Sequence, residues 1–195
     1  MKYLKLAELE AIPFFTVDDA SLVLGIKRES ARVFCSRKAK EGVFIRIKKD
    51  FYVSAGAWQG YAETDFFRIA NYLQVPSYIS CTNALSFHGV TTQVQRDWCE
   101  SVSLKRSVVY AVRGREFHYH KFMKPFYFGF EKRGSVFVAG KEKALIDACH
   151  LTALGRYSFD ADSLDVERFD REILREMSAP FPLRTQNMVR RICRT

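Results

Sequence analysis

Residues 15–54 constrain the fold of this chain more than any other stretch, because two glycines divide them into segments of different hydrophobic pattern. Apolar residues at helical spacing precede Gly25, which can adopt the positive φ that ends a helix. A second helical segment, residues 28–40, ends before Gly42, and residues 43–47 and 51–53 then alternate as two strands joined by a charged turn. This order predicts a winged helix-turn-helix, whose second helix enters the major groove of DNA.

The second helix of this stretch combines a small apolar face with a basic outer face. Ala31, Cys35 and Ala39 recur at helical spacing and are small enough for close packing against neighbouring helices. Nine basic and two acidic residues lie between positions 27 and 49. Arginine can bond guanine through two parallel hydrogen bonds, and lysines at a hairpin tip suit phosphate. The residues expected to bind DNA are Lys27, Arg28, Ser30, Arg32, Ser36, Arg37, Lys40, Arg46, Lys48 and Lys49.

The alternative without a function in binding is that these charged residues form a helix face exposed to solvent. An RNA-binding protein or a pure interaction protein would use a basic patch equally well, and only the order of helix and hairpin favours duplex DNA. The second half of the chain carries its own basic run, which is either a solvated sheet face, an extension of the DNA site, or a surface for a protein partner. That run contains Lys105, Arg106, Arg113, Arg115, Lys121, Lys124, Lys132 and Arg133.

The composition favours an ordered protein with a polyanionic partner. Hydrophobic residues make up 48% of the 195 residues, and the formal net charge is +9. The sequence contains no apolar run of about 20 residues that would cross a membrane, and its start does not resemble a signal peptide. Five scattered cysteines without a Cys-x-x-Cys pair argue against disulfides and zinc knuckles. We therefore expect a cytoplasmic, nucleoid-associated protein without a cofactor.

A link of small residues at positions 54–60 ends the first domain, which we place at residues 1–58, and leaves residues 59–195 for a second domain. The pattern of the second domain predicts helices mixed with an antiparallel sheet, so the whole chain is expected to be α+β. The expected helices outside the first stretch are 2–10, 63–73, 80–87, 141–152, 164–177 and 183–193. The expected strands of the second domain are 98–105, 107–112, 116–122, 126–130 and 135–139.

Two short motifs of the second domain fall in segments 78–89 and 138–147. The first contains Tyr78-Ile79-Ser80, Ala84-Leu85 and His88-Gly89, and the second contains Glu142-Lys143-Ala144-Leu145 followed by Asp147. Behind a winged helix, these motifs resemble the AbiEi family, the antitoxin-type transcriptional regulators of type IV toxin–antitoxin systems. Lys141 stands where that family often has proline, and the start of a helix accepts either residue.

The resemblance implies a repressor that binds inverted repeats upstream of its own operon. It also implies an antitoxin that counters a nucleotidyltransferase-like toxin encoded next door, as part of phage defence and without a stable complex between the two proteins. We expect a monomer in solution or a dimer on DNA. These expectations come from the resemblance and not from composition or periodicity.

Candidate catalytic and metal-binding residues are few. His118 and His120 share one face of an expected strand, which some metal sites use, but the sequence places no third ligand, so partly exposed histidines are the preferred interpretation. His88 is interpreted as a structural histidine at a helix end, Glu142 as a polar residue at a helix start, and Asp147 as a solvent or inter-element contact. We expect no metal site and no catalytic residue.

The alternative function from another class is a metal-dependent nuclease, or another nucleic-acid-processing enzyme with a winged-helix targeting domain. Such an enzyme needs a carboxylate cluster, often with an acidic residue two positions before a strand lysine. Ser103 occupies that position relative to Lys105, and Glu100 lies too far along the strand. We therefore expect a protein that is not an enzyme.

Overall fold

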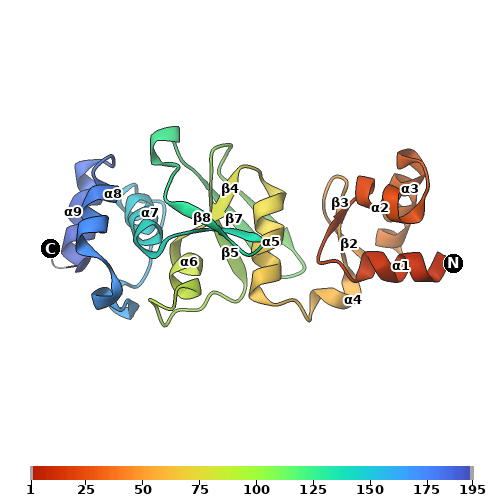
Figure 1. Cartoon of the computed structure of the whole chain (residues 1–195), viewed down its shortest axis with the longest axis horizontal. Helices are drawn as coiled ribbons and strands as arrows, with labels where there is room; N and C mark the ends of the chain where they lie inside the picture. The colour runs from red at the N-terminus through yellow and green to blue at the C-terminus, as the bar shows by residue number, and fades with distance from the viewer. Residues whose placement is uncertain (1, 194–195) are drawn as a thin grey trace. The chain divides into compact units, whose positions relative to one another are not determined.

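The computed structural model describes residues 2–193, and their side chains from residue 5 onward. The chain forms two compact units, residues 1–69 and residues 70–195, which follow one another along the colour bar of Figure 1. Each unit combines helices with a sheet, so the predicted α+β class is confirmed. Among the described residues, no helix is long and apolar enough to cross a membrane.

The first unit packs helices against a small antiparallel sheet. Its helices are α1 (Lys2–Glu10), α2 (Val17–Leu24), α3 (Arg28–Lys40) and the short α4 (Ala55–Trp58). The strands β1 (Phe15–Thr16), β2 (Phe44–Lys48) and β3 (Phe51–Ser54) pair in the order β1-β3-β2. The shared core consists of Leu9, Phe15, Val17, Ala20, Ala31, Phe34, Cys35, Phe44 and Tyr52.

The flanking residues of α2 define where that helix begins and ends. The hydroxyl of Thr16 accepts the backbone N–H of Asp19, and the carboxylate of Asp19 accepts the backbone N–H of Thr16 at 2.7 Å, which completes a capping box. At the other end, Gly25 has φ 66°, a left-handed conformation that costs glycine little. The predicted helix end at Gly25 is therefore confirmed, and the chain turns there toward α3.

An aromatic cluster keeps residues 55–69 with the first unit. The ring of Trp58 lies 5.1 Å from that of Phe66 and 5.9 Å from that of Tyr61, and the hydroxyl of Tyr61 donates to the carbonyl of Pro13 at 2.6 Å. The sequence pattern placed the boundary at residues 58/59, whereas the two units divide at 69/70, inside α5 (Glu63–Leu73). Small residues at 54–60 suggested a link, but the aromatic residues around them pack inward.

The second unit is built on a six-stranded sheet in the order β6-β7-β5-β4-β9-β8. Its strands are β4 (Ser77–Ile79), β5 (Trp98–Ser103), β6 (Val108–Val112), β7 (Arg115–Lys121), β8 (Phe130–Arg133) and β9 (Val136–Ala139). The pairs β4–β9 and β5–β7 are parallel, so the sheet is mixed, which corrects the prediction of an antiparallel sheet. The reason is that the β6–β7 hairpin folds so that β7, and not β6, pairs with β5.

Helices cover both faces of this sheet. The helices α6 (Cys81–Phe87) and α7 (Lys141–Ala153) lie on one face, as Figure 1 shows. On the opposite face, the hydroxyl of Tyr119 donates to the carbonyl of Ala70 in the last turn of α5 at 2.5 Å. The predicted alternation along β7 is confirmed, since Phe117 and Tyr119 are buried while His118 and His120 are only partly covered.

The helices α8 (Arg171–Ser178) and α9 (Leu183–Cys193) complete the second unit against α7. The predicted helix at 164–177 begins later than expected, because two short 3-10 helices, η2 (Ala161–Ser163) and η3 (Val166–Arg168), precede it. The carboxylate of Asp170 caps α8 by accepting the N–H groups of Glu172 and Ile173. Similarly, the expected strand at 126–130 begins only at its last residue, as β8 (Phe130–Arg133), because η1 (Lys124–Phe126) precedes it and the buried Phe126 stacks on Phe181 at 4.5 Å.

Candidate nucleic-acid interface

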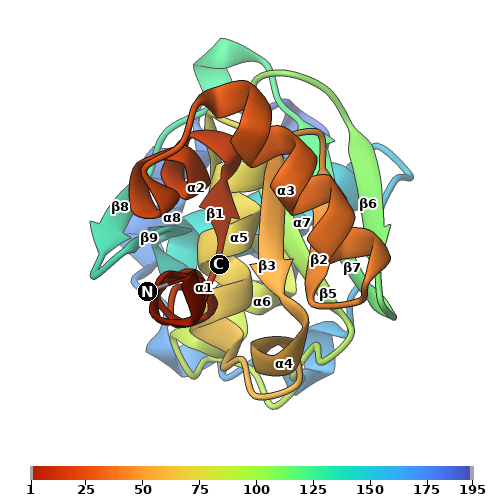
Figure 2. The same ribbon diagram turned by 90° about the vertical axis from the view of Figure 1, so that its right-hand side faces the viewer.

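The helix α3 has one buried face and one open face, and Figure 2 shows it beside the β2–β3 hairpin. Ala31 and Cys35 are fully buried, and Phe34 packs edge-to-face on Phe44 with ring centroids 6.2 Å apart. Burial raises the pKa of the Cys35 thiol to about 11, so this cysteine serves the core as a neutral group. The open face carries Glu29, Ser30, Val33, Arg37 and Lys40.

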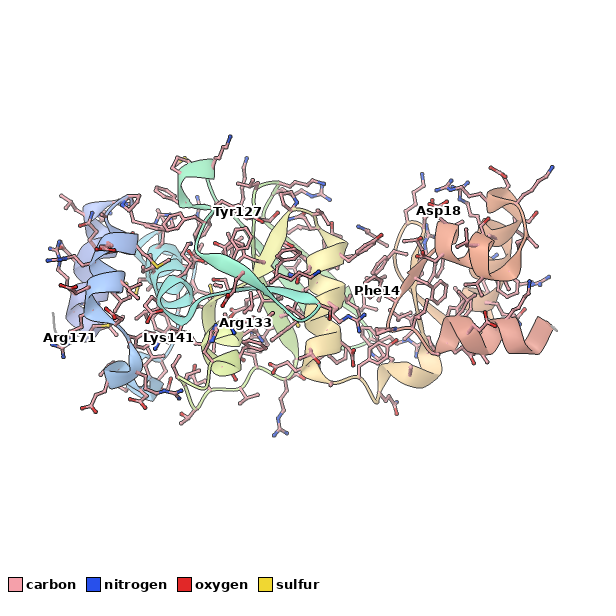
Figure 3. All side chains as sticks on the ribbon, in the orientation of Figure 1. Phe14, Asp18, Tyr127, Arg133, Lys141 and Arg171 are labelled. Carbon is pink, nitrogen blue, oxygen red and sulfur yellow. The ribbon has the colours of Figure 1, made fainter. Side chains whose placement is uncertain are left out.

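The hairpin turn binds the first half of α3 through one carboxylate. Asp50 accepts two parallel hydrogen bonds from Arg32, Nε at 3.1 Å and Nη2 at 3.0 Å, and a weaker contact from Arg28 Nη2 at 3.5 Å. Asp50 has φ 59°, a left-handed conformation that aspartate tolerates better than most residues. Arg28 also donates Nε to Asp18 at 2.5 Å, and Figure 3 labels Asp18 on α2. Asp50 therefore ties α3 to the hairpin and orients two arginines.

The ionisation of these groups follows from the contacts. The hydrogen bond and charge of Arg32 lower the pKa of the Asp50 carboxyl, and the same bond raises the pKa of Arg32. Both side chains remain partly exposed, at 41% for Arg32 and 21% for Asp50, so water screens their attraction. The arrangement is a surface ion pair with defined geometry and not a buried one.

The remaining predicted DNA-binding residues lie on the same unit and differ in their contacts and in their exposure to solvent. Arg37 Nε lies 3.6 Å from the Glu41 carboxylate, and Arg46 donates Nε to the Lys48 carbonyl at 3.4 Å. The ammonium group of Lys48 lies 5.7 Å from the centre of the Phe51 ring. Those classed as exposed are Lys27, Arg28, Ser30, Arg37, Lys40, Arg46 and Lys49, and those partly covered are Arg32, Ser36 and Lys48.

Sequence reasoning missed two residues of this surface, Asp50 and Val33. The basic stretch was defined as residues 27–49, so it excluded the next residue, Asp50. The carboxylate of Asp50 is the group that binds Arg28 and Arg32. An aspartate in a tight hairpin turn is a signal that could have been used, because it tolerates the left-handed conformation. Val33 was passed over because it is apolar, yet it is 67% exposed.

In the second unit, the two motifs that carry the family resemblance meet in space. Ser80 Oγ donates to Asp147 Oδ2 at 2.7 Å, and the hydroxyl of Tyr78 donates to the same oxygen at 3.0 Å. A ring nitrogen of His88 lies 2.8 Å from the carbonyl oxygen of Ala139, which belongs to the segment 138–147 of the second motif. The interpretation of His88 as a structural residue fits this contact. Of the two interpretations of Asp147, a solvent contact or a contact between elements, the second is confirmed, because its side chain is fully buried and bonds Tyr78 and Ser80.

The partner of Asp147 is a buried lysine in an aromatic cage. Lys143 Nζ contacts Asp147 Oδ1 and lies 3.0 Å from the hydroxyl of Tyr78. Burial lowers the pKa of Lys143 and raises the pKa of Asp147, and the attraction between the two groups opposes both shifts. The ring centres around Nζ, at 5.1 to 5.6 Å, belong to Tyr78, Phe122, Phe128 and Phe181.

A second polar cluster lines a shallow hollow of this unit. Glu100 is 3% exposed and accepts the N–H of Thr82 at 3.1 Å and the hydroxyl of Tyr157 at 3.0 Å. Burial raises the pKa of Glu100 to about 7 and lowers the pKa of His120 to about 4. His118 and His120 both line this hollow, and His118 Nε2 lies 2.6 Å from a carboxylate oxygen of Glu116. Glu100 therefore caps α6 and anchors Tyr157.

Among residues 2–193, no three His, Cys, Asp or Glu side chains are arranged to hold a metal ion. No model of a known protein family matches the chain, and no curated protein sequence matches it either. The positions and contacts of the residues are thus the basis for the functional argument.

Proposed function

We propose that this chain is a DNA-binding transcriptional repressor whose first unit is a winged helix-turn-helix. The observation that carries the proposal is the open face of α3, with Ser30, Arg37 and Lys40, beside a hairpin that Asp50 holds to the same helix. A helix fits the major groove when one face is free of packing and its angle to the rest of the module is set. Both conditions describe α3.

The hairpin supports the proposal through its charges. Arg46 and Lys49 are exposed on β2 and its turn, and Lys48 lies between them at the strand end with its ammonium group over an aromatic ring. Cations at this place can neutralise phosphates next to the groove that α3 occupies. In this proposal the open face of α3 reads bases and the hairpin grips the backbone.

The same proposal includes the antitoxin role that the AbiEi resemblance implies. Support comes from the second unit, where both resemblance motifs contribute to one buried network of Tyr78, Ser80, Lys143 and Asp147. The protein would repress its own operon from inverted repeats in the promoter, act in the cytoplasm at the nucleoid, and counter a nucleotidyltransferase-like toxin without a stable complex. Growth rescue by this chain during expression of the neighbouring gene tests that part.

The DNA-binding part is tested by a mobility-shift titration with the duplex just upstream of the gene and a scrambled duplex of equal length. We expect tighter binding to the upstream duplex, and a slope of log affinity against log salt of about 0.9 per phosphate contacted. The double variant R37A/K40A removes two cations of the open α3 face, and R190A/R191A removes two exposed cations of α9 as a matched control. Loss of binding in the first variant alone supports the proposal, while equal and salt-independent binding by all three proteins contradicts it.

A further inference from the structure

Two arginines of α3 already make hydrogen bonds within the first unit, and this reduces the number of α3 side chains that are free to contact bases. Arg32 is held by Asp50 through two hydrogen bonds, and Arg28 is shared between Asp18 and Asp50. These bonds direct both guanidinium groups toward the hairpin and α2. The central part of the open α3 face is therefore left to other side chains.

Ser30, Val33 and Arg37 occupy that central part. They are spaced three and four residues apart, so their side chains follow one another along a single helical face. Val33 is 67% exposed, and its neighbours on this face are polar. An apolar, β-branched side chain that is mostly exposed among polar neighbours is suited to contact an apolar group on a binding partner.

The major groove offers one apolar group among its base edges, the 5-methyl group of thymine. We propose that Val33 is a specificity residue of the DNA site and contacts a thymine methyl, with Ser30 and Arg37 bonding the base edges or phosphates on either side. The inference rests on the proposed DNA-binding function and names one of its contacts. It assigns thymine at the position that faces the middle of α3.

The test uses a duplex selected from a random library by the wild-type protein, in which thymines are replaced by uracil one at a time. Uracil pairs as thymine does and lacks only the 5-methyl group. We expect one replacement, or a symmetry-related pair, to weaken wild-type binding by about tenfold, the effect of losing contact with one or two methyl groups. The variant V33A should bind the thymine and uracil duplexes equally, at the level of wild type on uracil.

The matched control is V109A, which makes the same change at a valine that is 52% exposed on β6 of the other unit. It should retain the wild-type preference for thymine, and thermal unfolding of V33A should match wild type because Val33 is exposed. Retained thymine preference in V33A, or no uracil effect in wild type, overturns this inference and leaves DNA binding standing. Failure of wild type to enrich any sequence overturns the proposed function and the inference together.

Discussion

Each unit of this protein contains one ion pair that we compare, and the two pairs lie in opposite environments. Arg32 on α3 pairs with Asp50 of the hairpin turn, whereas Lys143 and Asp147 both lie on α7, where Asp147 also bonds Tyr78 of β4. In the first unit, the side chains of Arg32 and Asp50 are 41% and 21% exposed. In the second unit, the side chains of Lys143 and Asp147 are 0% exposed. Water screens the first pair, and such pairs contribute about 0–1 kcal/mol to stability. The second pair has lost its hydration, so each charge depends on its partner and on nearby hydroxyl groups.

This difference assigns the two pairs different roles. Opening the buried pair would leave a charge in an aromatic cage, so that pair fixes the packing of α7 against β4. Opening the surface pair costs little, because water or a phosphate can replace the carboxylate. In the proposed DNA complex, the Asp50 pair therefore aligns α3 with the hairpin in the free protein and can yield to the DNA backbone.

The largest effect is expected from Lys143→Met, which keeps a long apolar stem in the cage and removes the ammonium group. Asp147 is then buried without its cation, and the free energy of unfolding should fall by about 3–5 kcal/mol. Urea unfolding monitored by circular dichroism measures the change. A loss below about 1 kcal/mol would mean that the two charges do not depend on each other.

The double variant K143M/D147N tests the same point without relying on one substitution. It removes both charges, so it should recover a large part of the stability lost in K143M, with a coupling free energy of about 1–3 kcal/mol. Simple additivity of the two single changes would contradict the assigned role of the pair.

Glu100 sharpens the comparison, because this buried carboxyl group accepts its hydrogen bonds from two neutral donors, the N–H of Thr82 and the hydroxyl of Tyr157. Burial raises the pKa of this carboxyl from its ordinary value of about 4.5 to about 7 in the folded state. The folded protein therefore binds this proton more tightly than the unfolded chain, and stability falls as pH rises from about 4.5 to about 7. The loss amounts to about 3 kcal/mol for a shift of this size.

Glu100→Gln removes this loss, so its stability relative to wild type should increase by about 3 kcal/mol between pH 5 and pH 8. Unfolding titrations of both proteins across that range give the difference curve. His120 and His150, whose pKa values burial lowers to about 4, oppose the trend but occur in both proteins and cancel. A flat difference curve would show that Glu100 is ionised throughout.

The sequence pattern predicted much of the first unit because its signals are local. Gly25 ends α2, the apolar spacing of α3 matches its buried face, and the strands alternate toward a charged turn. The ion pairs of Asp50 were not predicted, since they join residues 18 or 22 positions apart through a turn conformation that no periodicity reports. The sequence pattern therefore assigned Arg28 and Arg32 to the open face of α3, whereas in the structure both arginines are hydrogen-bonded to aspartates.

The second unit was predicted less well because its order depends on long-range pairing. Strand β4 has three residues, too few for a pattern, yet it pairs with β5 and β9 in the middle of the sheet. The pairing of β5 with β7 across the β6–β7 hairpin made the sheet mixed. Burial of Lys143 could not be read from charge alone, because four aromatic rings from separate segments form its cage.

Smaller effects are expected at the surface of the first unit. Arg37→Ala should weaken binding to the selected sequence by about 1–3 kcal/mol and relax preference at the bases it faces. The pair K48A/K49A should weaken selected and random duplexes alike, and reduce the salt slope by about 2. Titrations of both variants against both duplexes separate the two roles. A change of sequence preference in the lysine variant, with none in R37A, would reverse the assigned orientation of helix and hairpin.

The smallest effect on stability is expected from Asp50→Asn, although its effect on DNA binding should be measurable. Asparagine tolerates the left-handed conformation at φ 59°, so the turn is retained while the charge that holds Arg28 and Arg32 is lost. The free energy of unfolding should change by less than about 1 kcal/mol. Random-duplex affinity should rise, with a salt slope steeper by about 1 to 2, because two guanidinium groups become available to phosphates.

The control for this variant is D18N, which removes a carboxylate from Arg28 alone and leaves the two bonds between Arg32 and Asp50 intact. It should give at most half the change in salt slope and keep the preference for the selected sequence. If D50N instead lowered stability by more than about 2 kcal/mol, the surface pair would hold the fold as the Lys143 pair does. If D50N left the affinity for random duplexes unchanged, Asp50 would not compete with phosphate. The two ion pairs would then differ in their exposure to solvent but not in a role in DNA binding.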